Sequence, residues 1–144
     1  MDVTATLDAP HAPEALFRVV EDLTTYPRWL DIVPRVVPDD GEAGPAWKID
    51  LRGRLGPFAR SKRLRMVRTE HVEPQKVVFE RRELDGRNHS PWVLTAEVQG
   101  AGSGSRLVMH LHYGGGLFGP VLERLLGDEI ERSKPKLLAL LDAS

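Results

Sequence analysis

The sequence predicts a single α+β domain in which one antiparallel sheet packs against a long C-terminal helix. Apolar and polar residues alternate in a series of segments between residues 36 and 113, which is the pattern of strands. Apolar residues then recur at helical spacing from 119 to 142. Strands that follow one another without helices between them indicate α+β rather than α/β. A length of 144 residues without internal repeats suits one domain, residues 1–144.

A strand and two short helices are expected first. Residues 3–7 alternate as a half-buried strand. Pro13 suits the first turn of a helix, and the apolar stripe that follows extends to Leu23. Residues 24–27 should end this helix, because the residue before a proline avoids the α region. We expect a second short helix at 28–33.

The middle of the chain is predicted to supply the rest of a curved antiparallel sheet of six to seven strands. These strands centre on 36–37, 47–52, 64–66, 77–79, 92–98 and 107–113. Turn residues separate them at 39–45, 53–57, 85–86 and 100–105. The dipeptide Asp85-Gly86 is typical of a hairpin turn.

The C-terminal helix should span about Gly119 to Asp142 and lie across the sheet. Its stripe would bury Leu122, Leu125, Leu126, Ile130, Leu137 and Leu141. Pro120 suits the helix start, and Pro135 removes one internal hydrogen bond and should kink the helix. The glycines at 114–116 are expected to let the chain turn from sheet to helix. No Gly-Lys-Ser/Thr follows them, so a phosphate cradle is not favoured.

One helix cannot cover the whole concave face of such a sheet. A sheet of this size twists and curls, so part of the concave face lies out of the helix's reach. A gap lined with apolar side chains should therefore remain unless bulky residues fill it. This gap is the predicted ligand site.

Composition excludes several classes of function. A net charge of -1 argues against general nucleic-acid binding, and no apolar run approaches the ~20 residues of a membrane span. The first residues lack the pattern of a signal peptide, so we expect a cytoplasmic location. The absence of cysteine excludes disulfides and thiolate chemistry. We expect no cofactor and a monomer or homodimer.

Several stretches carry a family resemblance that spans essentially the whole chain. The most specific stretch is 22–30, with the pattern D-L-x-x-Y-P-x-W, and Ala9-Pro10 and residues 72–79 add to it. The chain resembles the START-like, or SRPBCC, superfamily, in its polyketide cyclase/dehydrase-like branch. Several actinobacterial members look similar even at 114–120. The resemblance implies the helix-grip fold and a ligand cavity, but it does not imply one reaction.

Strand pairing predicts a cluster at one end of the concave face. A turn at 100–105 places Leu94 opposite Leu111 and Trp92 opposite Tyr113, and the turn near Gly86 brings Arg81 close to Trp92. Such a cluster either holds the polar end of an apolar ligand or only caps the core. The full set of candidate pocket residues is Arg81, Trp92, Tyr113, Tyr26, Trp29, Trp47, Phe79, Leu94, Met109 and Leu111.

Two charged patterns have a simpler interpretation than a site. His110 and His112 have a spacing that two metal ligands can use, but their apolar neighbours should face inward and leave both histidines in solvent. We therefore expect no metal. The basic stretch is either a patch for acidic partners or, as we favour, a solvated outer face balanced by nearby glutamates. It comprises Arg60, Lys62, Arg63, Arg65 and Arg68.

Three functions remain open. The first is binding, transport or sequestration of a hydrophobic small molecule such as a lipid, isoprenoid or polyketide. The second is a polyketide aromatase/cyclase or dehydrase, in which Arg81 stabilises an enolate and Tyr113 donates a proton. The third is a toxin–antitoxin or regulatory partner that acts through its surface. The few titratable groups expected on the inner face favour binding, and no residue is assigned as catalytic.

Overall fold

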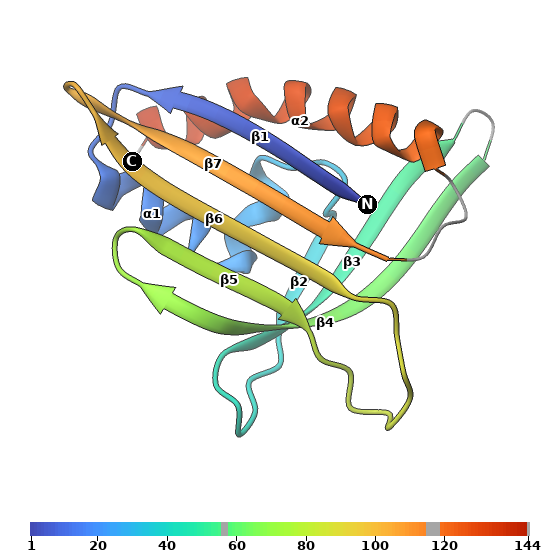
Figure 1. The fold of residues 1–144 in the computed structure, drawn as a ribbon. Coiled ribbons are helices and arrows are strands. Elements are labelled where there is room, and N and C mark those ends of the chain that lie inside the picture. Colours follow the sequence, from blue (N-terminus) through green and yellow to red (C-terminus); the bar gives the residue numbers. More distant parts are fainter. Residues whose placement is uncertain (56–57, 115–118, 144) are drawn as a thin grey trace.

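The computed structural model describes residues 1–55, 58–114 and 119–143 and has, within them, a curved sheet of seven antiparallel strands with one long helix lying across it (Figure 1). The strands are β1 (Asp2–Ala9), β2 (Arg35–Pro38), β3 (Ala46–Leu55), β4 (Phe58–Val72), β5 (Lys76–Arg81), β6 (Trp92–Ala101) and β7 (Gly104–Tyr113). Their order in the sheet is β1-β7-β6-β5-β4-β3-β2. The helices are α1 (Pro13–Val20), the 3₁₀ helix η1 (Leu23–Arg28) and α2 (Gly119–Asp142). The predicted fold class is confirmed.

Helix α2 has the predicted bounds and packs against β1, α1 and η1. Leu126, Leu137 and Leu141 are buried, as the apolar stripe requires. The side chains of Leu122 and Leu125, which were also expected to be buried, lie outside the described set. Each fully buried leucine contributes about 1.5–3 kcal/mol, so the stripe alone can hold α2 on the sheet. Among the described residues, no helix has the length and apolar character needed to cross a membrane.

The two short helices differ from the expected boundaries. α1 ends at Val20, and the second helix is η1 rather than the predicted 28–33. Asp22 causes the break, because its carboxylate accepts the backbone N–H of Thr24 at 2.9 Å and starts a new helical segment. The Thr25 and Tyr26 hydroxyls donate to carbonyls at the end of α1, which satisfies groups that an uninterrupted helix would have bonded.

The predicted register of the central strands is confirmed. Trp92 pairs with Tyr113 and Leu94 with Leu111, while Phe79 pairs with Leu94 across β5 and β6. The connection from β5 to β6 is a long loop over 82–91 rather than a tight hairpin, although Gly86 does have the positive φ of 71° expected in a turn. The loop has bonds of its own, since Asp85 accepts from the backbone N–H of Arg87 at 2.9 Å.

Two predicted turns lie wholly or partly outside the described residues. β3 continues to Leu55 and β4 begins at Phe58, so residues 56–57 of the expected turn at 53–57 are not covered. The glycine turn at 114–116 is covered only at Gly114.

Bulky side chains fill one part of the concave face. Phe17 of α1 and Tyr26 of η1 are almost completely buried there. Phe79 lies beneath them, with Tyr26 at 6.5 Å and Trp47 at 5.5 Å between ring centres, both in edge-to-face geometry. The part of the sheet under α2 has no comparable filling among the described residues, and this difference positions the site.

Candidate functional site

A cavity of about 510 Å³ lies between the concave face of the sheet and α2. Its size falls within the ~300–1,000 Å³ range of small-molecule sites. Most of its lining is apolar and comes from β1, β3, β4, β6, β7, η1 and α2. The apolar side chains include Val3, Leu7, Leu23, Ile49, Leu64, Met66, Leu107, Leu126, Ile130 and Leu137.

Most of the candidate residues from the sequence line this cavity. They are Tyr26, Trp29, Trp92, Leu94, Met109, Leu111 and Tyr113. Strand alternation explains why the sheet members meet there, since residues two apart on a strand share a face. Four further lining residues are not predicted as pocket residues, because a side chain that lines a cavity has the same apolar pattern as one that fills the core. They are Leu7, Ile49, Leu64 and Leu137.

Phe79, Trp47 and Arg81 are not among the lining residues. Phe79 and Trp47 pack against each other in the filled part of the core. Arg81 shares the inner face with Phe79, but its guanidinium turns toward the 82–91 loop. There Nε donates to Glu83 at 2.8 Å, and Nη1 donates to the backbone oxygen of Ser90 at 3.3 Å.

The predicted aromatic pair lies at the cavity together with a lysine that was not expected there. Trp92 and Tyr113 stack with ring centres 5.1 Å apart. Lys62 lines the same cavity, and its Nζ lies 5.4 Å from the centre of the Trp92 ring, within cation–π range. Partial burial lowers the pKa of Lys62, nearby Arg81 lowers it further, and Glu83 acts in the opposite direction.

The favoured interpretation of the basic stretch is therefore wrong for part of it. Arg63 does lie on the outer face, where Nε donates to Asp50 at 2.7 Å. Arg65 is buried and pairs with Asp39 at 2.8 Å. Lys62 points to the cavity, and the signal was its even spacing with Leu64 and Met66, both inward residues. The side chain of Arg60 is outside the described set.

Two indole nitrogens in the lining have unused donors. Trp29 Nε1 and Trp92 Nε1 are both buried and have no hydrogen-bond partner among the described residues. A buried donor left without an acceptor costs about 1–3 kcal/mol, so an acceptor brought by a ligand would stabilise the site. Tyr26 differs, because its hydroxyl donates to the Val20 carbonyl at 2.9 Å. Burial, with a smaller effect from Asp22, raises the pKa of Tyr26.

The two histidines of β7 lie away from this site. His110 and His112 each contact the same carboxylate oxygen of Asp2 at 3.0 Å, on the half-exposed outer side of the sheet. These hydrogen bonds lower the pKa of Asp2. Within the described part of the chain, no group of metal-binding side chains has an arrangement that could hold a metal ion.

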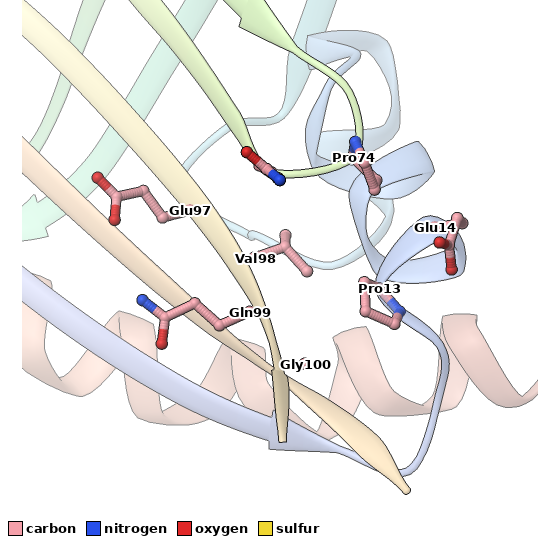
Figure 2. A pocket seen from close by; sticks show the side chains of 8 residues that line it. Pro13, Glu14, Pro74, Glu97, Val98, Gln99 and Gly100 are labelled. Carbon is pink, nitrogen blue, oxygen red and sulfur yellow. The ribbon is translucent and has the colours of Figure 1, made fainter. Parts of the chain in front are cut away.

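A second hollow of about 420 Å³ lies near the start of α1 (Figure 2). Val98 points toward α1 there, while Glu97 and Gln99 extend to the other side of β6. The remaining lining residues are Pro13, Glu14, Pro74, Gln75 and Gly100. This hollow has little apolar surface and includes Glu14, whereas the larger cavity combines apolar walls with unpartnered donors. We therefore take the larger cavity as the candidate site.

A curved antiparallel sheet with a C-terminal helix across it and a cavity between them defines the START-like, helix-grip class of proteins. The chain belongs to the polyketide cyclase / dehydrase and lipid transport family, whose profile matches residues 1–141. The match covers every strand and almost all of α2.

Solved structures support the fold. A START superfamily protein from Mycobacterium smegmatis has a TM-score of 0.73 at 15% identity, with 99% of this chain and 97% of that chain covered. A protein from Thermus thermophilus has a TM-score of 0.69 at 20% identity, with 99% of this chain and 95% of that chain covered. The di-domain ARO/CYC StfQ from the steffimycin biosynthetic pathway has a TM-score of 0.66 at 16% identity, with 99% of this chain and 49% of that chain covered. No curated protein matches the chain.

Proposed function

We propose that this protein binds a hydrophobic small molecule, such as a lipid, isoprenoid or polyketide, in the cavity between the sheet and α2. The observation that carries the proposal is the apolar cavity of about 510 Å³. Transfer of apolar surface out of water contributes about 25 cal/mol per Å², so a ligand buried by these walls gains substantial affinity. Transport and sequestration both need only this binding step.

The family description supports the same conclusion at a coarser level, because it covers both lipid transport and polyketide cyclase / dehydrase activity. We propose Trp29, Leu94, Met109, Leu111 and Tyr113 as the ligand-contacting residues, together with Tyr26 and Trp92. Trp47 and Phe79 support this wall from beneath.

A cyclase role has weaker structural support. The mechanism considered from the sequence used Arg81 to stabilise an enolate, but the Arg81 guanidinium is bonded to Glu83 and Ser90 and does not line the cavity. The Tyr113 hydroxyl is directed to the sulfur of Met1. No observation favours a proton transfer by this pair, so binding is the proposed function.

Native mass spectrometry of freshly purified protein tests the proposal. We expect a fraction of the protein to carry one apolar molecule per chain, which solvent extraction then releases for identification. A neutral fluorescent probe, N-phenylnaphthylamine, should compete with that molecule. Protein that carries no ligand and also shows no saturable probe binding would contradict the proposal.

A further inference from the structure

Lys62 differs from the other charged residues of the cavity lining in how its charge is balanced. Among the described residues, three charged side chains line the cavity: Lys62, Glu129 and Lys134. Glu129 pairs with Arg132, and Lys134 pairs with Glu131 at 2.8 Å. In the part of the chain that the structure describes, no carboxylate lies within ion-pair distance of Lys62.

The charged neighbours of Lys62 do not balance its charge. Arg81 and Glu83 are its charged neighbours, and they pair with each other at 2.8 Å. This pair is close to neutral as a unit, so the Lys62 ammonium remains as an excess positive charge at the edge of an apolar cavity. The face of the Trp92 ring, 5.4 Å from Nζ, is its one compensating contact among the described residues.

The other unused polar groups of the lining are also donors. Trp92 Nε1 is part of the ring that the Lys62 ammonium faces. The second unused donor is Nε1 of Trp29, the residue that directly follows η1 in the chain. An ammonium and indole N–H groups all require an acceptor. A hydrocarbon offers no acceptor to any of these groups, whereas the carboxylate of an acid beside Lys62 would pair with its ammonium.

We infer that the ligand is an amphiphile with an acidic head, whose carboxylate lies at Lys62 and whose apolar body fills the cavity. This inference rests on the proposed function and specifies its ligand class. Hydrogen bonds to charged groups contribute more to affinity than neutral ones, and here the pair is partly shielded from water. The acid should therefore bind more tightly than an alcohol of the same chain length.

Displacement of N-phenylnaphthylamine by tetradecanoate and by tetradecanol measures this preference. The Lys62→Met variant keeps the length and apolar stem of the side chain and removes its charge. We expect it to weaken tetradecanoate binding by about tenfold to a hundredfold, and to change tetradecanol binding by less than about twofold. Lys48→Met, at an exposed position of β3, is the matched control and should affect neither ligand.

The outcomes separate this inference from the proposed function. Wild-type protein that binds neither probe nor amphiphile contradicts the proposed function itself. Two results would overturn the acidic-head inference and leave the binding function standing. One is that wild type binds tetradecanol and tetradecanoate equally well, and the other is that Lys62→Met weakens the binding of both equally. Circular dichroism of each variant establishes that the fold is retained. A second variant, Lys62→Glu, should repel the acid and bind the alcohol as before.

Discussion

The Lys62 ammonium has an unusual setting for a lysine that is still open to solvent. It lies over an aromatic ring and near the Arg81 guanidinium. Partial burial and the neighbouring positive charge both disfavour the protonated form, which is why the pKa of Lys62 is lowered from 10.5. A lysine with a lowered pKa has a larger deprotonated, nucleophilic fraction at a given pH.

We expect Lys62 to react faster than Lys48, which is exposed as Lys62 is, with an amine-acylating reagent at mildly alkaline pH. The direction follows from the sign of the shift, since a lowered pKa means that the proton is lost at a lower pH. Peptide mass spectrometry after limited labelling measures both rates in one sample. Added tetradecanoate should slow labelling of Lys62 alone, and equal rates at both lysines would contradict this account.

Met109 allows the cavity to be filled from one wall. Its side chain lines the cavity, and Val108 beside it on β7 belongs to the opposite face of the strand. Met109→Trp should reduce binding of N-phenylnaphthylamine at least tenfold by occupying the ligand volume, whereas Val108→Trp should leave it within about twofold. Fluorescence titration measures both. Unchanged binding by Met109→Trp would place the probe elsewhere.

At the scale of elements, α2 and the short helices position the cavity in different ways. α2 forms one wall, and its position depends on leucines that reach the sheet and α1. α1 and η1 fill the rest of the concave face with Phe17 and Tyr26. The break between them depends on the Asp22 carboxylate, which accepts from both the Thr24 N–H and the Thr24 hydroxyl.

Leu141 tests how firmly α2 is held. It is 2% exposed and does not line the cavity, so its loss measures packing without changing the site. Leu141→Ala should lower the free energy of unfolding by about 2–5 kcal/mol. Leu84, 78% exposed, gives the control, and Leu84→Ala should change stability by less than about 0.5 kcal/mol. Equal effects in urea denaturation would show that α2 is not docked as described.

Asp22 tests the origin of the second helical segment. Asp22→Ala removes the acceptor for two hydrogen bonds and should destabilise the protein by about 0.5–2 kcal/mol. Asp22→Asn keeps an oxygen acceptor and should recover most of the loss. Thermal unfolding of the three proteins measures this, and an alanine variant as stable as wild type would contradict the capping role.

For the whole molecule, the sequence predicted the sheet, its central register and the long helix, because strand alternation and the helical stripe are local patterns. It also predicted that Trp92 and Tyr113 meet, since pairing follows from the turn between their strands. It did not predict the direction of the Arg81 guanidinium, because that depends on the later course of the 82–91 loop. The spacing of Lys62 with Leu64 indicates an inward position, but the surrounding basic residues favour one solvated face, so the sequence did not predict Lys62 at the cavity.

A crystal structure with a bromine-labelled long-chain alcohol tests the central claim most directly. The anomalous signal of bromine gives the position of the ligand independently of how its chain is built. The account predicts one bromine site per chain inside the cavity, between Met109 of the sheet and Leu137 of α2. A bromine in the hollow near Pro13 and Glu97, or only on the outer face of the sheet, would contradict it.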